Sequence, residues 1–253
     1  MELLNYKSCL ADPDLWMHAA KNSNGEDYYE YVLLYTDDAL VVSENPKECL
    51  LEIDKYFPMK KCSIDTPRLY LGGKISQVQL PNGVIAYALS MSQYVQEAIK
   101  NIERTIKQRG LTLNKKAQTP FTTDYSPIDG SEMLNDEDTT YYQSLIGILR
   151  WIVEMGRIDI SMEVSAMSSF IAAPRYGHLL QVLHIFTYLK CHHAARLVFD
   201  PSYPNINQED FPRKYWSGFY GEEKKASPQM HQRANARNSS SELMLMLHLQ
   251  DVN

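Results

Sequence analysis

The chain has 253 residues, of which 44% are hydrophobic, and it carries a formal net charge of −6. This length allows one large domain or two small ones, and the composition predicts a packed core rather than a disordered chain. The net charge argues against a uniformly basic nucleic-acid-binding protein. No stretch is long and apolar enough to span a bilayer, and the N-terminus lacks a secretory signal pattern. We therefore expect an intracellular protein with no membrane partner.

The first strong pattern along the chain is a β-hairpin predicted at residues 31–44, with the sequence YVLLYTDDALVVSE. Two runs rich in Tyr, Val and Leu closely flank Thr36, Asp37 and Asp38, which indicates strands joined by a short turn. Adjacent carboxylates at the end of a hairpin attract divalent cations, and hard oxygen ligands suit Mg²⁺. The alternative is a polar turn that happens to contain two aspartates. It stays open here, because an Asp-Asp pair alone is a weak signal.

A helix and a second hairpin are predicted next. Asn45 suits a helix N-cap and Pro46 suits the first helical position, so we expect a helix over about residues 46–57. Residues 68–90 predict strands that reverse at Pro81-Asn82-Gly83. Hairpin, helix and hairpin together indicate an α+β fold with a mainly antiparallel sheet.

A second helix is expected from about Met91 to Arg109. Ser90 and Gln93 have the spacing of a capping box, and Gly110 suits the end of the helix. The residues expected on its inner face are Tyr94, Ala98, Ile102 and Ile106.

The rest of the chain is predicted to be helical and then irregular. Three helical patterns cover about residues 139–155, 159–172 and 175–191, and a short strand is expected at 195–200. Beyond Pro201 the pattern decays, and we expect an irregular, disordered tail.

Charge is distributed unevenly along the chain. Residues 55–116 hold eleven Lys or Arg and three acidic residues, a net charge of +8, whereas residues 124–163 hold nine acidic residues and two Arg, a net charge of −7. A basic band of this kind could follow a phosphate backbone. A solvated helix face with its loops would give the same count, so both interpretations stand at this point.

The order of several short motifs along the chain resembles the order in a known protein family. The motifs are YTDD, KYFPMKK, LYLGGKI, LSMSQYVQEAI, TPF, YYQSLIGILRWIVEMGRIDISMEVSAMSSF and VLHIFTYLK. The order in which they follow one another resembles the order in the reverse transcriptases of copia-type (Ty1/copia) LTR retrotransposons. The resemblance covers about residues 3–221. The resemblance implies a truncated fragment of a pol polyprotein. The family activity would be RNA-directed DNA polymerisation by two-metal nucleotidyl transfer.

The resemblance also implies roles for individual residues. Asp37 and Asp38 would be catalytic and would hold Mg²⁺ or Mn²⁺, Asp38 less directly. The residues implied at the nucleotide or primer are Tyr35, Thr36, Lys60, Lys61, Leu71, Gly72, Gly73 and Lys74. The residues implied at the nucleic-acid backbone are Lys100, Arg104, Lys107 and Lys115. The implied partners are an RNA template, a DNA primer and the rest of the polyprotein, and the implied location is the cytoplasm, in a virus-like particle.

The resemblance implies four regions in the chain. They are a partial polymerase palm with the YTDD hairpin at 1–88, a thumb-like basic helix region at 89–118, a helical connection region at 119–200 and the irregular tail at 201–253. In this family another essential aspartate lies on an earlier palm strand, and only 34 residues precede Tyr35. We therefore expect weak metal binding and no polymerase activity from the chain alone. The alternatives are a surviving nucleic-acid-binding module in residues 55–116 and a non-functional structural remnant.

Overall fold

The computed structural model describes residues 1–36, 38–59, 63–126, 128–201 and 245–248. The chain divides into two compact units. Unit 1 comprises Met1–Pro67, Leu80–Ile85 and the residues from Asp200 onward, and unit 2 comprises Arg68–Gln79 and Ala86–Phe199. Each unit combines helices with antiparallel strands, so the predicted α+β class is confirmed.

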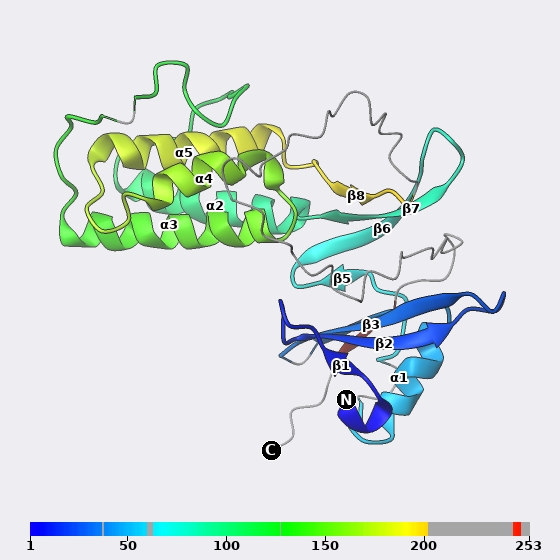
Figure 1. Ribbon diagram of the computed structural model, residues 1–253. Coiled ribbons are helices and arrows are strands. Elements are labelled where there is room, and N and C mark those ends of the chain that lie inside the picture. Colours follow the sequence, from blue (N-terminus) through cyan, green and yellow to red (C-terminus); the bar gives the residue numbers. More distant parts are fainter. Residues whose placement is uncertain (37, 60–62, 127, 202–244, 249–253) are drawn as a thin grey trace, which may run out of the picture. The chain divides into compact units, whose positions relative to one another are not determined.

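Unit 1 is built on a five-stranded antiparallel sheet with the strand order β1-β2-β3-β4-β9 (Figure 1). Its strands are β1 (Lys7–Ser8), β2 (Leu15–Lys21), β3 (Asp27–Tyr35), β4 (Asp38–Val42) and β9 (Leu245–His248). Sequence patterns predicted β3 and β4 but not β2, because LWMHAAK does not alternate between apolar and polar residues. Pairing with β3 along its whole length defines β2 as a strand.

Helix α1 (Pro46–Asp54) packs on this sheet. It begins where predicted but ends at Asp54 rather than near residue 57, since Pro58 disfavours a helical conformation for the residue before it. Leu50 of α1 is fully buried and packs in one apolar cluster with Val32 and Val41 of the sheet. Each buried side chain of this size contributes about 1.5–3 kcal/mol to folding, so this cluster positions the β3–β4 hairpin.

The predicted irregular tail lies mostly outside the described residues. Within it, the backbone of Leu245–His248 forms β9, which pairs with β4 from Leu245 opposite Val41 to His248 opposite Asp38. For these four residues the prediction of irregular structure was wrong. The local sequence of these residues does not indicate a strand. They form one by pairing with β4, which lies much earlier in the chain.

The described part of unit 2 contains a four-stranded sheet, with the order β5-β6-β7-β8, and four α-helices that lie side by side (Figure 1). The strands are β5 (Leu69–Tyr70), β6 (Gly73–Gln79), β7 (Ile85–Ser90) and β8 (Leu197–Phe199). The helices are α2 (Ser92–Gln108), α3 (Asp136–Glu154), α4 (Ser161–Ser168) and α5 (Tyr176–Cys191), and a 3₁₀ turn at Ile158–Ile160 precedes α4. Strand β8 confirms the short strand predicted at 195–200, and it pairs with β7.

The buried face of α2 differs from the predicted one. Val95 and Ile99 are buried beside the predicted Ile102, whereas Tyr94 and Ala98 are only partly buried. Apolar residues cover more of this helix than one face can bury, so its sequence allowed both orientations. Packing against the other helices of unit 2 decided between them.

The two ends of α2 differ in how well they agree with the predicted helix ends. The capping box of Ser90 and Gln93 was wrong, because Met91 is the N-cap and makes no side-chain capping bond. Ser90 is instead the last residue of β7, where the sheet holds its backbone. At the other end, Gly110 has a φ of +73°, which suits the predicted stop.

Helices α2 to α5 share one hydrophobic core. Its fully buried members include Val95 from α2, Tyr142 and Leu149 from α3, Met167 from α4 and Phe186 from α5. The boundary predicted between residues 118 and 119 therefore does not separate two cores, and the regions named after the polymerase stay a prediction. None of the described helices has the length and apolar character that crossing a membrane requires.

Candidate functional site

The YTDD sequence lies at the turn between β3 and β4, as predicted. Tyr35 pairs with Asp38 in the β3–β4 ladder. The loop that joins the two strands therefore has two residues, and Thr36 is the first of them. Asp38 is the first residue of β4 and is partly buried, whereas Tyr35 is exposed. Asp37, which is predicted to bind metal more directly, lies outside the described residues. The structure thus places one of the two predicted carboxylates at the end of a tight hairpin.

Thr36 has an unusual backbone conformation. Its φ is +53°, in the left-handed region that β-branched residues rarely adopt. Two-residue hairpins favour turns with positive φ, but Asn, Asp or Gly ordinarily supplies it. Strained residues persist where the surrounding structure holds them, and they concentrate at functional sites. The conformation of Thr36 is therefore a structural reason to treat this turn as a candidate site.

The turn between β5 and β6 has a similar strain. Leu71 and Gly72 form a two-residue loop with φ values of +49° and +81°. Gly73 follows in β6, where a Cβ atom would lie 2.6 Å from Cδ1 of Leu89, so a larger residue does not fit without movement. Lys74 is exposed beside it. The residues predicted to contact the primer thus lie in a tight turn and the strand that leaves it.

The predicted backbone-binding cations lie mainly on one face of α2. Lys100, Arg104 and Lys107 follow one another at spacings of four and three residues, and all three are exposed. Lys115 is exposed in the segment after the helix. Lys60 and Lys61 lie outside the described residues, so their predicted role stays a prediction.

Arg109 belongs to the same basic band but has an internal role. Its guanidinium pairs with Asp138 and, at 2.9 Å, with Glu137, and it lies 4.7 Å from the ring centroid of Tyr141. These partners belong to α3, in the acidic segment that follows the basic band. The opposite charges of the two segments were the sequence signal for this contact, because oppositely charged segments attract one another.

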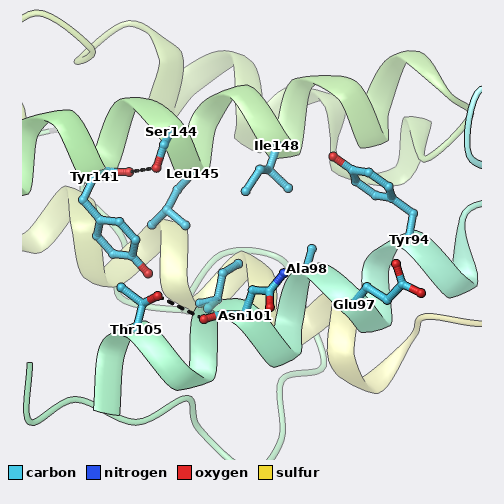
Figure 2. A pocket seen from close by; sticks show the side chains of 10 residues that line it. Tyr94, Glu97, Ala98, Asn101, Thr105, Tyr141, Ser144, Leu145 and Ile148 are labelled. Atoms are coloured by element: carbon cyan, nitrogen blue, oxygen red, sulfur yellow. Dashed lines mark hydrogen bonds between the residues drawn. The ribbon is translucent and has the colours of Figure 1, made fainter. Parts of the chain in front are cut away.

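A groove of about 280 Å³ lies between α2 and α3 (Figure 2). Tyr94 and Tyr141 lie at its opposite ends, and Leu145 and Ile148 of α3 lie between them. Sequence analysis placed Tyr94 in the core, and no pattern predicted the groove. A groove between two helices depends on which faces of the helices pack against each other. The sequence of one helix alone does not specify that packing.

A second cavity, of about 210 Å³, lies beside the first turn of α5. His178 Nε2 and Asp129 Oδ2 are 3.8 Å apart there, and neither atom has a hydrogen-bond partner among the described residues. The backbone N–H of Arg175 donates to His178 Nδ1, so Nε2 carries the proton of the neutral ring and cannot bind a metal. A water molecule that accepts from Nε2 and donates to Asp129 would satisfy both atoms.

Glu30 is the centre of a polar network in unit 1 that no sequence pattern predicted. The hydroxyls of Ser43 and Tyr28 donate to its Oε1 over 2.6 and 3.1 Å, and Cys49 Sγ lies 3.4 Å from the same atom. On the other side of the carboxylate, His18 Nδ1 lies 3.0 Å from Oε2 and Tyr6 donates its hydroxyl over 3.3 Å. The network joins β3, one strand of the YTDD hairpin, to β2 and α1.

Among the described residues, no group of three or more His, Cys, Asp or Glu side chains could hold a metal ion. The donor type at the hairpin still fits Mg²⁺, which prefers carboxylate oxygen and takes only one or two of these ligands from a protein. Asp38 is the described member of that predicted pair.

One comparison with known proteins supports a relation to retrotransposons. The chain is 32% identical over 162 residues to a Saccharomyces cerevisiae protein described as "Putative transposon Ty5-1 protein YCL074W". The match covers 63% of this chain and 48% of that protein, so the chain spans about half the length of this relative. No family model matches the sequence, and no solved structure does. The similarity supports a retrotransposon-derived protein.

Proposed function

We propose that this chain is a fragment of the reverse transcriptase of a copia-type retrotransposon, and that it does not extend a primer by itself. The observation that carries the proposal is the similarity to the Ty5-1 protein. Two features of the structure agree with it. The Asp-Asp sequence is at a tight hairpin turn, and both hairpins assigned to substrate binding contain a residue other than glycine at positive φ.

In this proposal Asp37 and Asp38 would hold Mg²⁺ or Mn²⁺, which neutralises charge on the triphosphate when it is bound. The β3–β4 ladder orients Asp38 by fixing its backbone opposite Tyr35. Lys74 and the Leu71–Gly72 turn would contact the primer. In the family that the chain resembles, a further essential aspartate lies on an earlier palm strand, and the described residues contain no group of three or more His, Cys, Asp or Glu side chains that could hold a metal ion. We therefore expect weak metal binding and a poorly oriented site.

The first prediction is that the chain will not extend a DNA primer on an RNA template in the presence of Mg²⁺. The measurement compares the native chain with Asp37→Asn by gel analysis of extended primer, and an active retroviral-type polymerase serves as the positive control. Equal, background-level signals are expected, because a site that lacks a ligand orients its metal poorly. Extension by the native chain that Asp37→Asn abolishes would show a complete active site and contradict the proposed inactivity.

A second candidate function, a nucleic-acid-binding module, is favoured by the exposed face of α2. Lys100, Arg104 and Lys107 present three cations along one side of a single helix. Such a face can neutralise phosphates without any metal site. This function predicts binding that persists in Asp37→Asn.

The second prediction concerns this face. Changing Lys100, Arg104 and Lys107 together to Gln should weaken binding to an RNA–DNA duplex by about tenfold or more, and should lower the slope of log K against log salt by about 2–3. Fluorescence anisotropy over a range of salt concentrations measures both. The matched control changes three exposed cations outside α2, namely Lys7, Lys47 and Arg150, to Gln. Equal losses in both triple variants would mean that net charge, and not this face, governs binding.

A further inference from the structure

The turn between β5 and β6 is too small to hold its own conformation. Strand β5 has two residues, and the ladder that it forms with β6 has two residue pairs. A hairpin this short is marginal in water. Leu71 and Gly72 also adopt positive φ in succession, which is unfavourable for leucine. Contacts from elsewhere in unit 2 must therefore stabilise the turn.

Tyr94 of α2 lies close to this turn. A Cβ atom placed on Gly72 would lie at an ordinary van der Waals distance, 3.6 Å, from Cδ2 of Tyr94, so the tyrosine ring lies about one methyl group away from the turn. The side chains of Leu71 and Tyr94 are both partly buried, and both pack against the same helical core. Leu71 is thus held against the helices as well as by the short ladder.

Tyr94 is itself held by rigid elements. It lies in the first turns of α2, which begins at Ser92 directly after β7 ends at Ser90. Its ring occupies one end of the groove between α2 and α3, toward Ile148, while Tyr141 occupies the other end (Figure 2). The ring therefore lies at the end of the groove and close to the β5–β6 turn.

We infer that Tyr94 is a positioning residue that holds the Leu71–Gly72 turn in the conformation that receives the 3′ end of a primer strand. This inference rests on the proposed function, since it takes the contact between this turn and a primer from that proposal. Tyr94 would touch no nucleic acid itself. Its effect would be specific for a strand end, in contrast to the exposed cations of α2, which would bind any phosphate backbone.

The test measures preference for a strand end by fluorescence anisotropy. The full chain is titrated with an RNA–DNA duplex that has a recessed DNA 3′ end and with a blunt duplex of the same number of base pairs. The native chain should prefer the recessed end, Tyr94→Ala should lose that preference, and Tyr94→Phe should keep it because the ring remains. Tyr141→Ala is the matched control, since it opens the other end of the same groove.

The outcomes separate the inference from the function on which it rests. If the native chain prefers the recessed end and Tyr94→Ala keeps that preference, the positioning role is overturned. If the native chain shows no preference for the recessed end, the primer-binding role of the turn fails, and the inference fails with it. Hydrogen exchange provides a second readout: amides of residues 69–75 should exchange faster in Tyr94→Ala while those of α3 stay protected. If Tyr94→Ala does not fold, Tyr94→Leu replaces it, because leucine fills space without a flat ring.

Discussion

Replacing Glu30 with alanine is expected to destabilise unit 1 by about 3–4 kcal/mol, because buried hydroxyls then lose their acceptor. Ser43 is fully buried and Tyr28 nearly so, and both donate to the Glu30 carboxylate. Each buried donor left without a partner costs about 1–3 kcal/mol. A loss of this size is a large part of the stability of a small domain.

Hydrogen exchange read segment by segment measures this loss. Amides of β2, β3 and β4 should lose protection in Glu30→Ala, while those of α3 and α5 in unit 2 should not. The matched control is Glu52→Gln, an exposed carboxylate on α1 in the same unit, which should change stability by less than about 0.5 kcal/mol. Similar exchange in the two variants would show that the network contributes little.

The same network predicts how unit 1 responds to acid. Burial alone would raise the pKa of Glu30, but hydrogen bonds from His18, Ser43 and the other donors outweigh it and hold the pKa below its ordinary value of 4.5. The unfolded state then binds the proton more tightly than the folded state. The contribution of Glu30 is therefore complete above about pH 4.5, and it is lost as the pH falls through the lower folded pKa. Glu30→Gln should remove this part of the acid sensitivity.

The second large effect is expected at Arg157, a buried cation between α3 and α4. Its Nε and Nη2 atoms each donate to the Asp159 carboxylate over 2.8 Å, and only 2% of the residue is exposed. Tyr188 donates to the same carboxylate over 3.2 Å. Asp159→Ala would leave a buried charge without its partner, which costs about 3–5 kcal/mol for a fully buried pair. Because Asp159 is partly exposed, we expect a loss of about 2–4 kcal/mol.

Urea unfolding of three variants tests this expectation. Asp159→Ala should lower the unfolding midpoint most, whereas the double variant Arg157→Met with Asp159→Ala should recover part of the loss, because no unpaired charge remains. Glu154→Gln, an exposed carboxylate at the end of α3, is the control. If the double variant is no more stable than Asp159→Ala, the cost comes from lost packing and not from an unpaired charge.

Local patterns predicted much of the fold because hairpins and helices are specified by neighbouring residues. The YTDD hairpin and α3 lie where the sequence placed them, and β8 was predicted from a short apolar run. Strand β2 was missed, because its residues become a strand only by pairing with β3. The inner face of α2 was assigned wrongly in part, since Tyr94 and Val95 are adjacent apolar residues and only packing shows which one is buried.

For the candidate site, the sequence by itself determined which chemical groups are available. It placed two carboxylates at a turn, put cations at helical spacing along α2, and related the chain to a transposon protein. Only the tertiary structure decided which groups meet. It paired Arg109 with two carboxylates of α3, placed Tyr94 close to the Leu71–Gly72 turn, and gathered five side chains around Glu30. Such contacts join residues far apart in the chain, and they form only when the helices and strands pack together, which no local pattern specifies.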